Sequence, residues 1–285
     1  MPERRPESRT TTIEGTPLRW LEQPASEDRS GVPVVLVHGI PTSSALWRHV
    51  VPLLPGLGVL VPEMTGYGDS IPAGAGRDIG LAAQADRLLA WLDGRGVREA
   101  VLVGHDLGGG VVQIMAVRRP ELCAGLLLTN AVGYDSWPVP SVKVLAAARG
   151  LVARLPGRVV TSSLAGLFVR GHDNAATAAE SRRTHMRPYL EHGAGPALAR
   201  QVASLDVRDT LEVSPRLAEL RVPARVMWGD ADPFQKVEYG ERFADDLRVP
   251  LHRIEGGRHF TPEDHPDVLA AHVLDLHREV VQRRR

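Results

Sequence analysis

One short segment places a reactive carboxylate between glycines. Residues 101–110 read VLVGHDLGGG, an apolar strand pattern that runs into a helical one. A G-x-nucleophile-x-G turn of this kind forms a nucleophile elbow, in which the glycines permit a strained turn and close packing of the helix. The usual serine is replaced by Asp106. The segment therefore predicts Asp106 as a nucleophile, although an Asp at this place could also simply cap the helix that follows.

Two later residues complete a possible triad with Asp106. Asp232 follows a strand expected at 225–228, and His259 follows a strand expected at 251–254. Nucleophile, acid and histidine in this chain order are typical of hydrolases built on open α/β sheets. Because such sheets bind ligands at the carboxyl ends of their strands, we expect the three side chains to meet there. Asp230, which lies nearer the strand, is the alternative acid.

The elements needed to position these residues alternate along the chain. A hairpin is expected over 11–22 with its turn at 14–16, and the later periodicities alternate between strands and helices. The expected strands are 34–37, 58–61, 100–103, 126–129, 225–228 and 251–254. The expected helices are 44–54, 81–92, 108–118, 236–243 and 266–281. This alternation predicts an α/β fold with a mostly parallel sheet flanked by helices.

One region interrupts the alternation. Residues 134–215 are rich in Ala, Arg and Leu at helical spacing and contain no convincing strand. We therefore predict a core made of residues 1–133 and 216–285, with 134–215 inserted as a helical cap over the sheet.

Composition limits the class of partner. The 285 residues are 43% hydrophobic and carry a formal net charge of +0, so no global field attracts nucleic acid or an acidic membrane surface. The amino terminus lacks an apolar signal region, and no apolar run approaches membrane-spanning length. The single cysteine, Cys123, is interpreted as a core thiol. We expect a cytoplasmic monomer or homodimer that acts on a small molecule, with no nucleic-acid or membrane partner and neither a metal nor an organic cofactor.

Three motifs resemble one branch of a known superfamily. They are HGIPTSSALWR at 38–48, GYGDS at 66–70 and GHDLGG at 104–109. Together they are similar to the haloalkane dehalogenase and epoxide hydrolase branch of the α/β-hydrolase superfamily, and the likeness extends from about Thr11 to Val280. The resemblance implies that Asp106 is the nucleophile, Asp232 the relay acid and His259 the base, and that the insertion caps the pocket.

The implied reaction suits a carboxylate. An Asp side chain, with a reference pKa of ~3.9, is ionised at neutral pH and needs no base to activate it. Attack on a saturated carbon would give an ester on Asp106, which water activated by His259 would then cleave. By position, the backbone amides of Ile40 and Leu107 should form the oxyanion hole. His38 and His105 are interpreted as structural residues of the motifs.

The leaving group distinguishes the members of this branch. Similar dehalogenases carry Asn where this chain has Ile40 and Trp where it has Leu107, and those side chains hold the departing halide. Without either donor, a halide anion would be left unpaired in a dry pocket. An epoxide hydrolase on a small organic or natural-product epoxide is therefore the favoured interpretation, and a haloalkane dehalogenase is an alternative.

An epoxide hydrolase needs an acid for the ring oxygen. Similar enzymes place two cap tyrosines there, but no such pair is evident in this chain. Tyr189 is one candidate donor, and His185, which shares its helix face, is another. Tyr134 and Trp137, at the start of the insertion, are further candidate pocket residues.

Other functions remain open at this point. An ester or lactone hydrolase, or a cyclase or lyase of secondary metabolism, could use the same residues differently, and a ligand-binding protein without catalysis could share the fold. The intact triad argues against a silent receptor. A carboxylate that attacks an acyl group forms an anhydride, which argues against an ordinary carboxylesterase.

Overall fold

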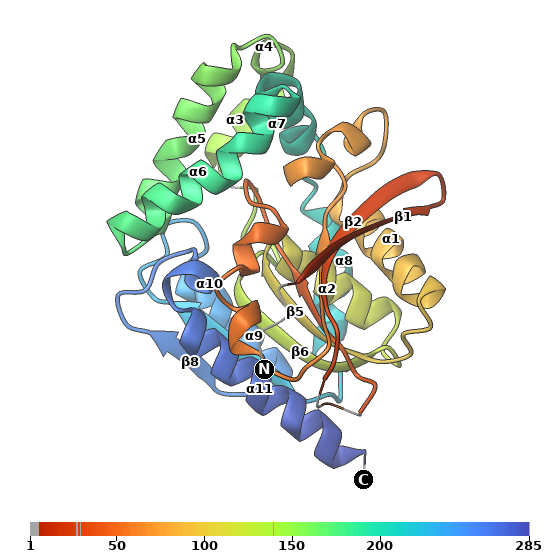
Figure 1. Cartoon of the computed structure of the whole chain (residues 1–285). Coiled ribbons are helices and arrows are strands. Elements are labelled where there is room, and N and C mark those ends of the chain that lie inside the picture. The colour runs from red at the N-terminus through yellow and green to blue at the C-terminus, as the bar shows by residue number, and fades with distance from the viewer. Residues whose placement is uncertain (1–5, 27, 29, 139, 285) are drawn as a thin grey trace.

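A single mixed sheet organises the molecule (Figure 1). The computed structural model describes residues 6–26, 28, 30–138 and 140–284. Eight strands lie in the order β1-β2-β4-β3-β5-β6-β7-β8. Only β1 with β2 and β2 with β4 pair antiparallel, and the other neighbours pair parallel. The strands are β1 (Glu7–Ile13), β2 (Thr16–Gln23), β3 (Val34–Val37), β4 (Val59–Glu63), β5 (Ala100–Asp106), β6 (Cys123–Ala131), β7 (Ala224–Gly229) and β8 (Leu251–Ile254).

Helices cover both faces of this sheet. They are α1 (Leu81–Gly94), α2 (Leu107–Arg118), α9 (Val237–Leu247), α10 (Thr261–Asp264) and α11 (Pro266–Arg283). Successive strand residues point to opposite faces, so Val35 and Val37 of β3 pack with the residues of α1 and α2. Val34 and Leu36 pack on the other side, with the residues of α11. The predicted parallel sheet between helical layers is confirmed.

The expected helix at 44–54 is wrong as a continuous α-helix. Two 3-10 helices stand there, η1 (Ser44–Trp47) and η2 (Val51–Leu53). The apolar residues at helical spacing are buried as expected, including Trp47 and Leu54. However, Pro52 has no backbone N–H and cannot continue an α-helical ladder. Two further 3-10 helices, η3 (Gly68–Ser70) and η4 (Pro72–Gly74), follow β4.

The predicted hairpin and buried thiol are confirmed. β1 and β2 join through Glu14 and Gly15, both at positive φ, as a tight two-residue turn between twisted strands requires. Cys123 is buried at the start of β6, and burial raises the pKa of its thiol to about 12. A thiol held neutral in this way packs as an apolar side chain.

Six helices lie between β6 and β7 in the described residues: α3 (Pro140–Ala147), α4 (Arg149–Val152), α5 (Gly157–Gly171), α6 (Ala175–His192), α7 (Ala194–Ala203) and α8 (Arg208–Leu217). Figure 1 places α3 to α7 together above the sheet. Helix α8 instead packs on α2, where Val213 and Leu217 join the core. No described helix is long and apolar enough to cross a membrane.

Candidate active site

The elbow holds Asp106 in a strained conformation at the end of β5. Its φ is +50°, in the region that non-glycine residues seldom adopt, and α2 begins at the next residue. A Cβ on Gly108 would lie 2.1 Å from the Val37 carbonyl oxygen, so only glycine lets the helix approach β3 this closely. The Asp106 side chain makes no capping hydrogen bond, so it does not serve as an ordinary N-cap.

The two carboxylate oxygens of Asp106 have different neighbours. Oδ2 accepts a hydrogen bond from the Ile40 amide at 2.8 Å, and a Cβ on Gly39 would lie only 2.2 Å from this oxygen. Oδ1 instead faces Nε2 of His259 at 3.9 Å. Burial raises the pKa of Asp106, while His259 and the Ile40 and Leu107 amides oppose that rise. One oxygen is thus fixed by the Ile40 amide and the other faces the His259 ring.

His259 lies between two carboxylates. Nδ1 of its ring is 2.8 Å from Oδ2 of Asp232, a separation at which the imidazole donates to the carboxylate. Oδ1 of Asp232 accepts from the amides of Phe234 and Gln235 at 2.7 and 3.0 Å. Burial disfavours the charged form of Asp232, but His259 and these amides outweigh it and hold its pKa below the ordinary value.

Asp230, the alternative acid, lies elsewhere. Its Oδ1 accepts from the Gly256 amide at 2.8 Å in an exposed turn. The carboxylate therefore belongs to the turn between β8 and the His259 loop. Of the two acids after β7, only Asp232 contacts His259.

The charge around His259 sets its protonation. Burial alone would lower the pKa of His259, but Asp232 and then Asp106 more than compensate, and the pKa lies above the usual value. The ring therefore has a partner on each side, Asp232 at Nδ1 and Asp106 beyond Nε2. Any event that removes the charge of Asp106 would lower the pKa of His259 and favour the neutral base.

Two motif residues support this arrangement through their neighbours. Nε2 of His105 lies 2.8 Å from the backbone oxygen of His259, and burial lowers the pKa of His105 to about 3, so the neutral ring donates that bond. The amide nitrogen of Asn130 donates to Oδ2 of Asp232 at 2.7 Å. Through these contacts His105 and Asn130 position His259 and Asp232.

Three of the candidate donors from the insertion already have hydrogen-bond partners. The Tyr189 hydroxyl donates to Gln201 at 2.7 Å, and the Tyr134 hydroxyl donates to Asp246 at 2.7 Å. The indole N–H of Trp137 donates to Thr210 at 2.8 Å. Each of these three donors already has a partner away from the elbow.

Tyr67 is the tyrosine that sequence reasoning passed over. It stands in the GYGDS motif and is buried, 1% exposed. Burial raises its pKa first, and the charge of Asp106 adds to the rise, so the phenol lies within the electrostatic reach of the nucleophile. Its ring lies 6.0 Å from that of His38, and no residue spacing in the sequence could show this neighbour.

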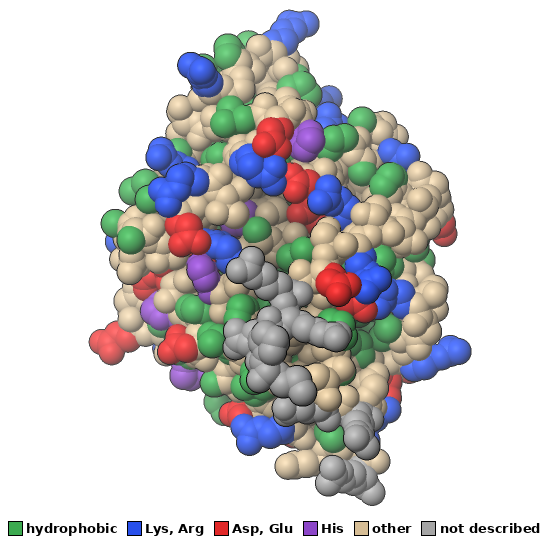
Figure 2. Space-filling model, in the orientation of Figure 1, with side chains coloured by type: hydrophobic (Ala, Val, Ile, Leu, Met, Phe, Trp, Pro, Cys, Tyr) green, Lys and Arg blue, Asp and Glu red, His purple; other side chains and the backbone are tan. Residues whose placement is uncertain are grey.

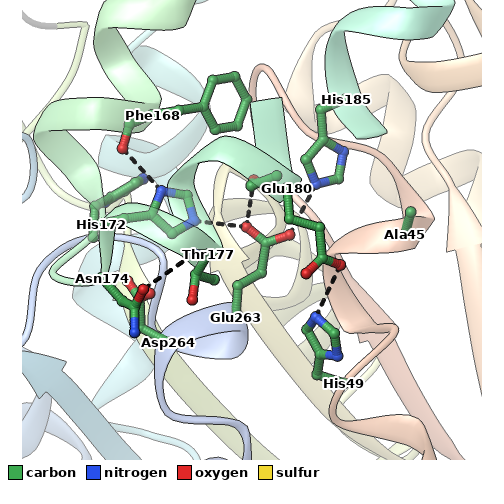
Figure 3. Close-up of polar contacts among 12 residues, drawn as sticks. Ala45, His49, Phe168, His172, Asn174, Thr177, Glu180, His185, Glu263 and Asp264 are labelled. Carbon is green, nitrogen blue, oxygen red and sulfur yellow. Dashed lines mark hydrogen bonds and ion pairs between the residues drawn. The ribbon is translucent and has the colours of Figure 1, made fainter. Parts of the chain in front are cut away.

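His185 belongs to a buried network centred on Glu263 (Figure 3). Its Nε2 lies 3.1 Å from Glu263, and its Nδ1 lies 3.1 Å from the Ser43 hydroxyl. His172 contacts Glu263 at 2.9 Å, and Ser181 donates to it at 2.5 Å. The Arg48 guanidinium completes the set of partners.

These partners keep Glu263 charged. Its side chain is 0% exposed, so burial alone would raise its pKa. The hydrogen bonds from His172 and His185 and the charges of His185 and Arg48 reverse that effect and hold its pKa well below the ordinary value. A buried carboxylate with this many donors is a structural anion rather than a titrating acid.

The network joins three parts of the chain. Glu263 lies in α10, four residues after His259. Ser43 precedes η1 in the loop that carries Ile40, and His172, Ser181 and His185 come from α5 and α6. The loops of the base and the oxyanion hole are thus tied to the inserted helices. Residue spacing gave no signal for this network, because its members are brought together only by tertiary contacts.

The described residues contain one group with metal-ligand geometry. Asp69, Glu191 and His192 lie together at the surface. Arg187 already pairs with Asp69 at 3.0 Å and with Glu191 at 2.6 Å. This group is explained as a surface ion-pair cluster, apart from the triad.

Comparisons with known proteins agree on the architecture. The family model described as alpha/beta hydrolase fold matches residues 32–266. A haloalkane dehalogenase of Bradyrhizobium diazoefficiens is 29% identical over 94% of this chain and 93% of its own. Epoxide hydrolase B of Mycobacterium tuberculosis is 35% identical over 35% of this chain and 29% of its own. The crystal structure of an alpha/beta hydrolase fold protein from Burkholderia ambifaria has a TM-score of 0.82 at 26% identity, covering 94% of this chain and 97% of its own.

Glu263→Gln should destabilise the protein by about 3 kcal/mol at neutral pH, because it removes the anion from a buried ion pair. Since the folded-state pKa of Glu263 is depressed, its contribution is complete above the unfolded value of about 4.3 and is lost as the pH falls toward the folded value. Urea unfolding at pH 7 and below pH 4 would measure both effects.

Glu241→Gln is the matched control for this substitution. Glu241 pairs with Arg253 at the surface, where both side chains are 47% exposed, so its loss should cost less than about 1 kcal/mol. Equal destabilisation by the two variants would show that the Glu263 network adds nothing beyond a surface pair.

Asp232→Asn should lower the pKa of His259 by about one pH unit or more, because it removes the larger of the two charges that raise it. Asp230→Asn should leave that pKa near its wild-type value, since Asp230 contacts Gly256 instead. Titration of the imidazole by NMR measures both variants directly. The reverse ranking would transfer the acid role to Asp230.

Proposed function

Because this chain belongs to the α/β-hydrolase fold family, we propose that it is a hydrolase in which Asp106 forms a covalent ester with an epoxide and His259 directs its hydrolysis. One observation carries the proposal. Asp106, at the elbow, has Oδ2 on the Ile40 amide at 2.8 Å and Oδ1 facing His259 at 3.9 Å, while His259 contacts Asp232 at 2.8 Å.

The first step follows from the two unequal oxygens of Asp106. Oδ1 has no amide partner and attacks an epoxide carbon, which breaks the bond from that carbon to the ring oxygen and leaves an alkoxide. Oδ2, held by Ile40, becomes the carbonyl oxygen of the new ester. Burial raises the pKa of Asp106, and the nearby His259 and amides favour the anion that attacks.

The second step uses the gap between His259 and Asp106. The 3.9 Å from Nε2 to Oδ1 exceeds a hydrogen bond, and a water that reaches the ester carbonyl carbon from this side can give its proton to Nε2. Oxyanion charge then develops on Oδ2, where the Ile40 and Leu107 amides stabilise it. Collapse then breaks the bond from the carbonyl carbon to Oδ1, and the imidazolium gives its proton to the departing oxygen. The diol leaves with Oδ1, and the oxygen of water remains in the Asp106 carboxylate.

Ester formation prepares the base for this step. The charge of Asp106 helps to raise the pKa of His259 in the free enzyme, and esterification removes that charge. The pKa of His259 then falls, and the ring becomes neutral when it must accept a proton. Asp232 retains its charge and stabilises the imidazolium that forms.

The choice of an epoxide over a haloalkane rests on the side chains around the leaving group. Ile40 and Leu107 carry no side-chain donor that could bind a halide anion. The dehalogenase from Bradyrhizobium keeps haloalkane hydrolysis as the second candidate, since its similarity covers nearly the whole chain. The partial similarity to epoxide hydrolase B supports the first.

An alkoxide leaving group needs a proton donor, and Tyr67 is the best candidate. Its phenol is buried within electrostatic reach of Asp106, and its raised pKa keeps it protonated at neutral pH. Tyr189 donates to Gln201, His185 lies between Ser43 and Glu263, and the Tyr67 phenol has the Ser204 side chain as a partner. Tyr67 is preferred because its pKa responds to the charge of Asp106.

The proposal includes a role for the inserted helices. Within the inserted residues 134–215, we regard α3 to α7 as a cap that excludes water while the ester forms. The Glu263 network supports this role, because it ties α5 and α6 to the loop of His259. The partners required are a small organic or natural-product epoxide and water.

His259→Gln should trap the ester. Incubation with styrene oxide should add the mass of one substrate to the peptide that carries Asp106, because attack can proceed while hydrolysis lacks its base. Mass spectrometry of the intact protein and of its peptides measures the adduct. The same experiment with 1-bromobutane compares the two leaving groups, and the epoxide should react faster.

The control for trapping is His259→Gln with Asp106→Asn, which should gain no mass. An adduct on another residue would contradict the mechanism. Faster reaction with the bromoalkane would keep the nucleophile but replace the epoxide by a haloalkane.

Tyr67→Phe, in the His259→Gln background, should slow single-turnover alkylation by styrene oxide about a hundredfold or more, since general acids commonly contribute this much. Tyr189→Phe removes a hydroxyl that is bound to Gln201 and is the matched control. If Tyr189→Phe slows the step and Tyr67→Phe does not, the donor is Tyr189.

A further inference from the structure

The zero net charge of the chain conceals a regional imbalance. Residues 140–192, from the start of α3 to the end of α6, contain eight Lys and Arg but three Asp and Glu, whereas the rest of the chain contains 26 and 31. The first 32 of these residues contain five basic residues and no acidic one. Charge asymmetry within a chain points to an interaction with a charged partner.

The acidic residues of this region already have partners. Asp173 pairs with His265 at 2.7 Å, and Glu180 pairs with Arg48 at 2.8 Å. Glu191 pairs with Arg187 at 2.6 Å. The seven other basic side chains are exposed and have no acidic partner among the described residues. They are Lys143, Arg149, Arg154, Arg158, Arg170, Arg182 and Arg183.

Exposed apolar side chains are concentrated in the same helices. Seven large hydrophobic residues of the described chain are well exposed, and five of them lie here: Val144, Leu151, Val159, Val169 and Leu190, at 67%, 65%, 48%, 67% and 55%. We call these five residues and the seven unpaired basic ones the outer face of the insertion. Exposed apolar groups gathered among cations mark an interaction surface.

Helix α5 shows the pattern most clearly. Its exposed positions include Val159, Ser162, Gly166 and Val169, whose spacing of three and four places them in one stripe. The stripe contains no acidic residue. A shallow hollow separates α5 from α6, with Ala165, Met186 and Leu190 among its lining residues and Arg182 and Arg183 beside them. Figure 2 shows basic and hydrophobic side chains side by side at the top and upper left, where Figure 1 places the insertion.

We propose that the outer face of the insertion docks reversibly on an anionic lipid bilayer. Interfacial helices combine apolar side chains that enter the headgroup region with Lys and Arg that bind anionic lipids. The outer face has both, and the three acids of the region, each paired with another group, do not cancel its charge. A surface contact of this kind needs no spanning helix, and it revises the expectation of no membrane partner, which rested on the charge of the whole chain.

Two other partners fit the outer face less well. Nucleic-acid surfaces that bind single strands use exposed aromatic rings for stacking, but Phe168 and Tyr189 of these helices are buried. A second copy of the same face would bring like charges together across a symmetric interface, which is unfavourable. An anionic lipid surface satisfies both the cations and the apolar side chains.

The test is co-sedimentation with vesicles of phosphatidylcholine mixed with phosphatidylglycerol, compared with phosphatidylcholine alone. The wild type should bind the anionic vesicles at low salt and release as salt is raised. Arg182→Gln with Arg183→Gln should lower the partition constant about 25-fold, at about fivefold for each cation. Val159→Ser with Val169→Ser should lower it severalfold at any salt concentration.

The matched control is Arg216→Gln with Arg278→Gln, which removes two exposed arginines of α8 and α11, at 54% and 71% exposure, and should leave the partition unchanged. Circular dichroism melting would show that all variants fold alike. Absence of binding to anionic vesicles, or equal loss in the control variant, would overturn the proposal. Preferential binding to a nucleic acid, or a dimer abolished by the outer-face variants, would assign the face to that partner instead.

Discussion

The hydrogen bond from the Ile40 amide to Oδ2 of Asp106 is the contact on which the rest of the site depends. It makes the two oxygens of one carboxylate unequal, because one is bound and the other faces His259. The strained φ of Asp106, the close packing at Gly108 and the absence of a side chain at Gly39 all serve to bring that carboxylate to the Ile40 amide. Loss of any of these would leave the nucleophile without a fixed orientation.

Electrostatics then links the nucleophile to its base. Asp106 and Asp232 both raise the pKa of His259, so the protonation of the ring depends on the charge of the residue that it serves. An anionic nucleophile and a neutral histidine are needed at different steps of the proposed reaction, and esterification of Asp106 separates them in time. The Glu263 anion stabilises a different part of the site, since it holds the loops and the inserted helices together.

The fold and the meeting of Asp106, Asp232 and His259 could be predicted because they depend on local signals. These signals are the ends of the strands, the glycines around Asp106 and the order of Asp232 and His259 in the sequence. The residues that surround these three side chains could not be predicted in this way. The partners of Glu263 come from segments far apart in the sequence. The prediction of a helix at 44–54 was wrong because Pro52 interrupts the backbone hydrogen bonds of an α-helix, although the apolar residues had helical spacing.

The candidate proton donors show the same limit of prediction from sequence. Tyr189 and His185 share a helix face as expected, but a shared face does not determine which groups it meets. Tyr189 meets Gln201, and His185 meets Glu263 and Ser43. A polar side chain that is buried must find a partner, so the candidates that lay deepest in the insertion were already satisfied there. Tyr67, in the turn that leads into η3, instead has its ring 6.0 Å from that of His38, two residues before Ile40, and its pKa responds to the charge of Asp106.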